Sequence, residues 1–141
     1  MSIKHKIILT YTKDLSVEIP DVQTLLLARE RISKYKLNLD ISSKIVKDKM
    51  IEVFTKLIYT DVEQSKQKAY FELLHSTVVE IEDINVKKNE MEKFILCDLQ
   101  FEVFPKIREA FVKILRHSGF PEANFSGEID FLKLYQQRSN Q

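Results

Sequence analysis

IKHKIILTYTKDLSVEIP, residues 3–20, decides the fold because its side chains alternate along almost the whole stretch. The mainly apolar set is Ile3, His5, Ile7, Leu9, Tyr11, Lys13, Leu15, Val17 and Ile19. The mainly polar set is Lys4, Lys6, Ile8, Thr10, Thr12, Asp14, Ser16 and Glu18. Only His5, Lys13 and Ile8 break the pattern. A period of two predicts a long strand with one face on the core and one in water. Pro20 ends the strand because proline cannot donate a hydrogen bond to a sheet.

Three further stretches predict strands. Residues 35–41 alternate again, and residues 50–60 are rich in β-branched and aromatic side chains. Residues 71–81 alternate apolar positions with glutamate and serine. The polar stretch 61–68 is typical of a hairpin loop, and residues 21–33 (DVQTLLLARERIS) form a connection or a short helix. Sequential strands joined by short polar loops predict an antiparallel sheet.

The period changes from about Asn89 onward. Apolar residues then recur at helical spacing, at Phe104, Ile107, Phe111 and Ile114. Pro105 lies inside this pattern, so the helix is either kinked there or begins near it. Gly119 is placed to end the helix. Ser126 is a plausible N-cap for a short last helix.

Four strands followed by helices predict an α+β fold. We expect a four-stranded antiparallel sheet with a long helix and a short C-terminal helix packed on one face. The polar set of the first strand requires the other face to be exposed. The 141 residues can bury one core, so a single domain over residues 1–141 is expected.

Charge and hydrophobicity exclude several functional classes. The chain has 22 basic and 21 acidic side chains, and this balance gives no electrostatic basis for binding nucleic acid. No stretch approaches the ~18 apolar residues of a membrane span. The apolar run Ile7–Leu9 is far too short for a signal peptide. A cytoplasmic protein that is not integral to the membrane is therefore expected.

Residues that carry chemistry form no recognisable site. His5, His75 and His117 belong to no acid–base or metal-binding motif. Two glycines cannot build a phosphate-binding loop, and Cys97 lies in an apolar run typical of a buried thiol. We therefore expect no catalytic residues, no metal and no cofactor. An enzyme built on the same sheet and helices is the alternative from a different class.

Three sequence blocks carry a family resemblance. Residues 11–20 (YTKDLSVEIP) resemble the first strand of the SecB protein-export chaperones, Tyr-x-Lys-Asp-[Leu/Ile]-Ser-x-Glu-x-Pro. Phe104-Pro105-x-x-Arg108 resembles the family's helix motif. The block Gly119-Phe120-Pro121, followed by Ile129 to Tyr135, resembles its carboxyl end. The blocks have the family's order and spacing and span residues 11–135.

The resemblance implies an activity and partners. It implies a homotetramer, a dimer of dimers, that binds unfolded preproteins in long grooves without ATP. It also implies that the exposed sheet face presents acidic residues to the translocation ATPase SecA. By position these contacts fall on Asp14, Glu18, Tyr70 and Glu72.

Client binding requires broad exposed apolar surface. Leu25, Leu26 and Leu27 lie in the connection after the first strand and either face a groove or form a turn of buried helix. Phe54 and Ile58 lie on the strand face opposite Val53, Thr55, Leu57 and Tyr59. Apolar residues on both faces predict a second layer, either a client groove or a subunit interface.

The chain also departs from the family pattern. It has no tryptophan, the connection reads Leu25–Leu27, and Ser76-Thr77 replaces the usual Gly-Gly. Its charge is near neutral, whereas most members are strongly acidic. These differences suit the alternative of a SecB-like chaperone dedicated to one client, such as an antitoxin. A purely structural oligomer is the remaining alternative.

Overall fold

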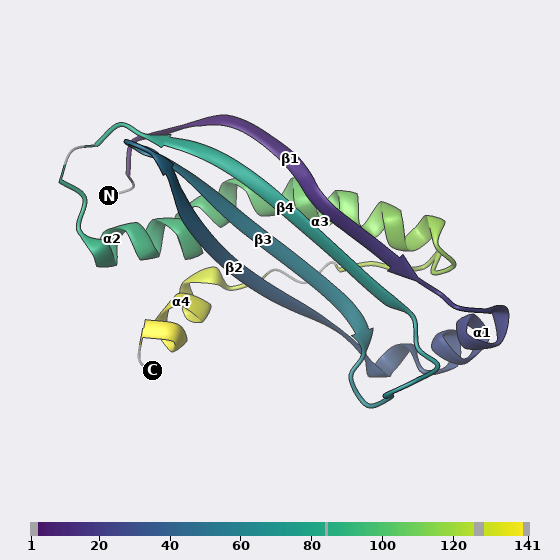
Figure 1. Ribbon diagram of the computed structural model, residues 1–141. Coiled ribbons are helices and arrows are strands. Elements are labelled where there is room, and N and C mark those ends of the chain that lie inside the picture. The colour runs from purple at the N-terminus through teal and green to yellow at the C-terminus, as the bar shows by residue number, and fades with distance from the viewer. Residues whose placement is uncertain (1–2, 84, 126–128, 140–141) are drawn as a thin grey trace.

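The computed structural model describes residues 3–83, 85–125 and 129–139. Its centre is a four-stranded antiparallel sheet in the order β1-β4-β3-β2 (Figure 1). The strands are β1 (His5–Glu18), β2 (Tyr35–Lys47), β3 (Met50–Asp61) and β4 (Tyr70–Ile81). The predicted strands and their antiparallel pairing are confirmed, although β2 extends six residues beyond the predicted end at residue 41.

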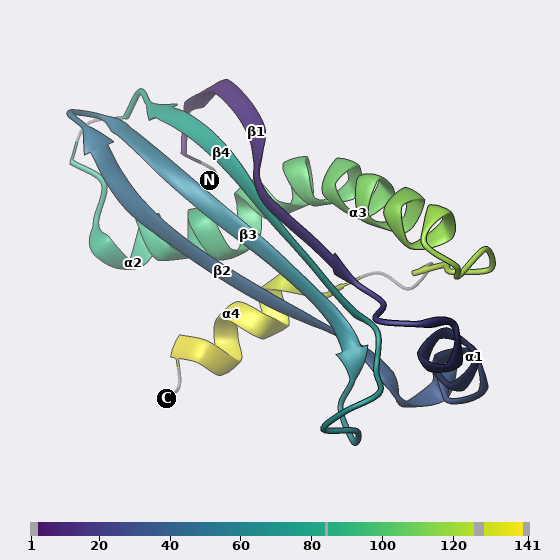
Figure 2. The same ribbon diagram turned by 45° about the vertical axis from the view of Figure 1, so that its right-hand side comes forward.

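The helical segments cover one face of this sheet. They are α1 (Val22–Glu30), the 3-10 turn η1 (Ile32–Lys34), α2 (Lys88–Lys93), the π-helical turn η2 (Phe94–Asp98), α3 (Leu99–His117) and α4 (Phe131–Ser139). Figures 1 and 2 show α2, α3 and α4 on the same side of the sheet and α1 at the end where β1 leaves it. No described element covers the opposite side, which we call the open face. The α+β class is confirmed.

The core lies between the sheet and the helices. On the helix side, β3 and β4 contribute Val53, Leu57, Phe71, Leu73 and Val79, all fully or almost fully buried. From α3 the buried side chains include Val103, Phe104, Ile107, Phe111 and Leu115. Their helical spacing places them in one stripe toward the sheet, as the sequence predicts.

Strand β1 departs from simple alternation. Its pairing with β4 skips Ile8 and Lys13, which form two β-bulges. Because each bulge shifts the phase by one residue, Tyr11 pairs with Ser76 on the open face, and Thr12 pairs with His75 on the helix side. The same shift puts Leu9 on the open face and Thr10 on the helix side. The predicted faces of the segment between the bulges are therefore wrong, whereas those before and after it are correct.

The C-terminal half also refines the prediction. Pro105 lies inside α3, so no helix begins there; the helical run starts at Lys88 and passes through the π-helical turn. Gly119, with φ of 102°, follows the C-cap Ser118 and ends α3 as predicted. Ser126 lies outside the described residues. The backbone N–H of Lys133 donates to the Asp130 carboxylate at 3.0 Å in the first turn of α4.

Candidate polypeptide-binding groove and open sheet face

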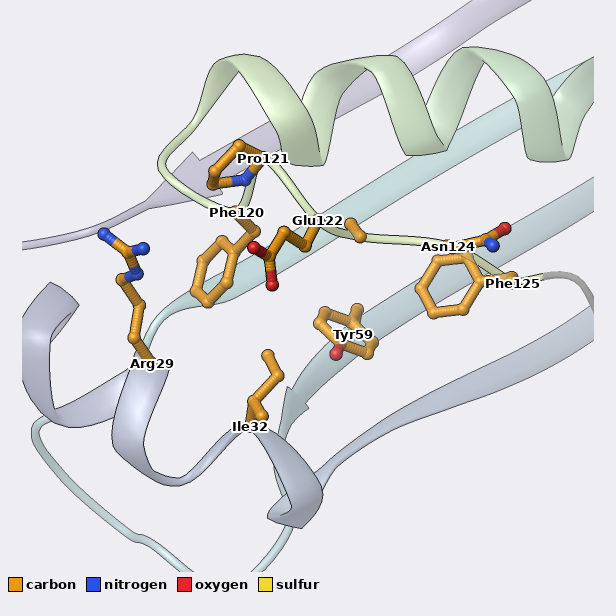
Figure 3. A pocket seen from close by; sticks show the side chains of 9 residues that line it. Arg29, Ile32, Tyr59, Phe120, Pro121, Glu122, Asn124 and Phe125 are labelled. Atoms are coloured by element: carbon orange, nitrogen blue, oxygen red, sulfur yellow. The ribbon is translucent and has the colours of Figure 1, made fainter.

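A groove of about 380 Å³ opens between α1, η1 and the chain that follows α3 (Figure 3). Its lining is Arg29, Ile32, Tyr59, Phe120, Pro121, Glu122, Ala123, Asn124 and Phe125. Three aromatic rings line the groove, and its two full charges come from Arg29 and Glu122. The lining is therefore mixed: aromatic and aliphatic side chains lie among polar and charged groups, a composition suited to a chain that presents both apolar side chains and polar backbone.

The sequence after α3 builds one wall of the groove. Gly119 adopts a left-handed conformation that lets the chain reverse, and Phe120 then turns into the core. The Phe120 ring lies 5.5 Å from Phe71 between centroids. Arg116 of α3 donates from Nε to the carbonyl of Ala123 at 3.0 Å, which ties this segment back to the helix.

Aromatic contacts fix the floor of the groove. Tyr59 of β3 contacts Phe125 edge-on, with centroids 5.2 Å apart, and also lies 5.5 Å from Tyr35. Burial, together with the neighbouring Tyr35, raises the pKa of Tyr59. The phenol therefore stays neutral at physiological pH, and the floor carries no charge.

The opposite wall is held by polar contacts at both ends of the first helix. Asp21 caps α1 by accepting a hydrogen bond from the Thr24 N–H at 2.7 Å. Arg31, just after α1, donates from Nε to Asp61 at 2.7 Å, which fixes the helix to the end of β3. Ile32 follows with its side chain exposed.

The leucines predicted to contact clients lie beside this groove and do not line it. Leu25 points at Gly119, where an added Cβ would meet its Cδ1 at 2.8 Å. Leu26 is 57% exposed, and Leu27 is partly buried. The α1 turn thus combines the two predicted alternatives, since one leucine is exposed and the others are partly buried.

Phe54 and Ile58 lie elsewhere. They pair with Ser76 and Glu72 on the open face, on the other side of the sheet from the groove. The structure therefore divides the five predicted client-binding residues between two surfaces. Their role in binding stays a prediction.

The four residues predicted to contact SecA lie together on the open face. Glu18 pairs with Tyr70, and Asp14 pairs with Leu74 in the adjacent strand. Tyr70 donates its hydroxyl proton to Glu72 at 2.6 Å. This hydrogen bond, with burial and the nearby carboxylates of Glu72 and Glu18, raises the pKa of Tyr70 to about 12. The result is a small acidic patch with a neutral phenol in it.

A second apolar groove follows the free edge of β2. It measures about 420 Å³ and is lined by Ile41, Ser42, Ser43, Glu92, Ile95, Leu96 and Tyr135. A smaller hollow beside it adds Leu39 and Leu134. Because β2 is an edge strand, no described strand pairs with its outer side along this groove.

The groove between α1 and residues 120–125 contains residues that the sequence analysis did not select. Tyr59, Phe120 and Phe125 come from segments about sixty residues apart in the chain. The available signal was local: Phe120 and Phe125 closely follow the helix-ending Gly119, and aromatic residues in a loop are candidates for binding.

Cys97 and His5 each lie against neighbouring side chains. Cys97 is buried, and burial raises the pKa of its thiol. His5 bonds to Glu102 at 2.9 Å, and its ring lies against Phe94. Across the described part of the chain, no cluster of three or more His, Cys, Asp or Glu side chains is arranged to hold a metal. Among those same residues, no helix is long and apolar enough to cross a membrane.

Comparisons with known proteins agree with this architecture. The profile of the family "Preprotein translocase subunit SecB" matches residues 2–141. A putative protein-export protein SecB of Pelagibacter ubique is 43% identical over 140 residues, covering 99% of this chain and all of the relative. A protein-export protein SecB of Rhodopseudomonas palustris is 28% identical over 128 residues, covering 90% of this chain and 76% of the relative.

Solved structures share the fold at low sequence identity. A SecB-like chaperone of Mycobacterium tuberculosis, in complex with a peptide from an antitoxin, superposes with a TM-score of 0.64 at 10% identity. The match covers 88% of this chain and 90% of that one. A Streptococcus agalactiae protein of unknown function gives a TM-score of 0.52, also at 10% identity, over 92% of this chain and 100% of that one.

Fold and sequence together define the class as a protein-export chaperone. The chain belongs to the SecB family.

Proposed function

We propose that the protein holds non-native polypeptides in the groove between α1 and residues 120–125, without ATP, and keeps preproteins competent for export from the cytoplasm. The observation that carries this proposal is the uncharged aromatic floor formed by Tyr59, Phe120 and Phe125. Tyr59 and Phe120 are only 8% and 4% exposed, so the partly exposed Phe125 and the exposed Ile32 offer most of the apolar surface to a client. Uncharged carbon surface of this kind accepts apolar side chains of many shapes.

The groove suits many weak contacts with a client. Burial of apolar area contributes roughly 25 cal/mol per Å², and ordering of the client opposes it. Arg29 and Glu122, one on each wall, can bond to backbone or polar groups of the bound chain. Clients would therefore be selected by exposed apolar residues and not by one sequence.

An extended client can also use the edge of β2. The hollow beside Ile41, Leu96 and Tyr135 is mainly apolar and lies along the outermost strand of the sheet. A client segment that pairs with this edge would gain main-chain hydrogen bonds in addition to side-chain burial. Binding at both grooves would raise the affinity by effective concentration.

We further propose that SecA docks on the open face at Asp14, Glu18, Tyr70 and Glu72. Support comes from their gathering on two adjacent strands. An acidic patch that includes a neutral aromatic side chain is a reasonable docking surface for a basic partner segment.

The proposal includes a homotetramer, a dimer of dimers. Strand β1 is a sheet edge that exposes Ile8, Leu15 and Val17 in one copy. An exposed apolar edge strand is a liability unless another chain covers it, and a second copy would do so.

Suppression of client aggregation tests the holding function. Wild-type protein, at one tetramer per unfolded client, should lower light scattering without ATP. The Ile32→Ser/Phe125→Ala variant should suppress it several-fold less, because it removes groove lining without touching a fully buried side chain. Phe101→Ala, an exposed aromatic outside the groove, is the matched control. If wild-type protein left the light scattering unchanged, the holding function would be refuted. If the groove variant suppressed aggregation as well as wild type, clients would have to bind at another surface.

Binding of purified SecA tests the docking surface separately. Asp14→Ala/Glu18→Ala should weaken SecA binding, whereas Glu90→Ala/Glu109→Ala, which removes two carboxylates from the helices, should not. Equal affinity for wild type and the first variant would remove the docking assignment and leave the fold intact.

The second candidate is a chaperone dedicated to one client. The structural likeness to a SecB-like chaperone in complex with an antitoxin peptide favours it, as does a net charge of +1. A toxin–antitoxin gene pair beside this gene, and a preference for that antitoxin over unfolded preproteins in competition binding, would distinguish it from the general export role.

A further inference from the structure

The centre of the open face carries an aromatic ring under two cations. The ammonium of Lys13 lies 4.9 Å from the centroid of the Phe54 ring, and that of Lys44 lies 5.9 Å from it. The three residues come from β1, β3 and β2, and they meet because the intervening β4 position is the small Ser76. Lys13 is itself the extra residue of a bulge, which aims it across the sheet.

A buried carboxylate holds this arrangement in place. Glu52 is only 6% exposed and accepts a hydrogen bond from Ser76 at 2.5 Å and another from Tyr11. Lys44 Nζ lies 3.8 Å from its other oxygen. Both hydroxyls donate to Oε2, and Lys44 is the charged neighbour of Oε1, so each exposed ammonium group still keeps N–H donors for a further acceptor.

The solvent-exposed charge around Phe54 is therefore positive. Lys13 and Lys44 are exposed to solvent, and the one carboxylate between them is covered. Farther along the same face lies the acidic patch of Asp14, Glu18 and Glu72. The open face thus has a basic centre next to an acidic end.

We propose that the Lys13–Phe54–Lys44 cluster is a second docking site, for an acidic linear segment of a partner protein. A carboxylate of the segment lies between the two ammonium groups, and an adjacent apolar side chain packs at the edge of the Phe54 ring. This goes beyond the docking of SecA at the acidic end, because it requires the opposite charge on the partner.

The surroundings favour a peptide over a nucleic acid. The next row of the sheet toward the acidic end carries two carboxylates, Asp14 and Asp40, and one cation, Lys56, which pairs with Asp40. A continuous phosphate backbone would meet these carboxylates, whereas a short peptide can place one or two carboxylates between the lysines and avoid them. The cluster also lies on the side of the sheet away from the client groove, so the two functions can be separated experimentally.

Three labelled peptides, alternating leucine with glutamate, serine or lysine, provide the probe in fluorescence anisotropy. The glutamate peptide should bind wild-type protein between about three- and tenfold more tightly than the serine peptide at low salt, and the difference should shrink at high salt. Lys13→Ala/Lys44→Ala should remove this preference. Lys106→Ala/Lys113→Ala, two exposed lysines on α3, should keep it.

Two further variants sharpen the result. Glu52→Gln should strengthen binding of the glutamate peptide, since it removes the one negative charge from the cluster. Ile32→Ser/Phe125→Ala should lose client holding and retain the acidic preference, which separates this proposal from the groove. Equal binding of the glutamate and serine peptides, or a preference unaffected by Lys13→Ala/Lys44→Ala, would overturn it. Tighter binding of a short DNA duplex through the same two lysines would also overturn it, in favour of a nucleic acid.

Discussion

Arg31 and Asp61 form a bidentate ion pair that ties the end of α1 to the end of β3. Arg31 Nε donates to Asp61 at 2.7 Å, and the second contact, from Nη2, is 3.4 Å. The Asp61 side chain is 1% exposed and also accepts from the backbone N–H groups of Glu63 and Gln64. One carboxylate therefore organises both the groove wall and the start of the β3–β4 loop.

Asp61→Asn should lower the free energy of unfolding at pH 7 by about 1–3 kcal/mol, because charge-assisted hydrogen bonds are lost from a buried group. The Arg31 hydrogen bond lowers the pKa of Asp61 in the folded chain. Its contribution is thus complete above about pH 4 and is lost as pH falls through the folded-state pKa. Urea unfolding at several pH values should show a shallower acid limb for the variant. Glu63→Gln, in an exposed ion pair, is the control and should change stability little.

Gly119→Ala should cost about 1–3 kcal/mol, since a side chain at φ of 102° is strained. Its Cβ would also meet Leu25 Cδ1 at 2.8 Å. In a Leu25→Ala background this contact disappears, so the cost of Gly119→Ala should fall but not vanish. Thermal or urea unfolding of the four proteins of the cycle measures the coupling. A zero coupling energy would show that the close approach does not contribute.

His5 and His75 should titrate on opposite sides of pH 6.5. Partial burial alone would lower the pKa of His5, but hydrogen bonds with the Ile3 carbonyl and with Glu102 raise it. Burial lowers the pKa of His75. NMR titration of the imidazole protons should resolve the two, and Glu102→Gln should lower the pKa of His5 alone. The His5 contribution to stability is present below pH 6.5 and is lost as pH rises through its folded-state pKa; that of His75 has the opposite sign.

Phe111→Ala should destabilise the protein by about 3–5 kcal/mol, because its fully buried ring fills the space between α3 and the sheet. Phe101→Ala, on the exposed side of the same helix, should cost much less, since its ring, which contacts Phe131, is 59% exposed. Chemical denaturation of both variants makes the comparison. Similar losses at the two positions would contradict the assigned core face of α3.

The strands were predictable where one face is clearly more apolar than the other. In β3 the buried row Val53–Leu57 follows the period of two, and so do Phe71, Leu73, Thr77 and Val79 in β4, where His75 of the same row is only partly buried. The faces of the β1 segment between the bulges were not predictable, because a bulge changes which face each residue occupies without changing the amino-acid composition. The signal was nevertheless present: Ile8 and Lys13, which break the alternation, are the two bulge residues.

The candidate sites were predictable to different degrees. The placement of Asp14 and Glu18 on the open face followed from the alternation, because the second bulge restores the original phase before Asp14. The groove could not be predicted from the alternation, because Tyr59 and Phe125 come into contact only when the chain after α3 returns along the sheet. This contact depends on tertiary packing, which a local sequence pattern does not predict.

The two bulges of β1 have a consequence for how insertions and deletions would act. Each of the two bulge residues, Ile8 and Lys13, shifts the alternation of faces along the strand by one residue, and the second shift cancels the first. Because Thr12 and Asp14 already pair with the consecutive residues His75 and Leu74, deleting Lys13 would remove the bulge and leave Leu15 and Val17 on the helix side and Asp14 and Glu18 on the open face. Deleting both Ile8 and Lys13 would make the strand regular, with the same residues on each face and without the local bends that bulges produce. The register of β1 is therefore set by its paired residues, and Ile8 and Lys13 are the two positions where a deletion would leave that register unchanged.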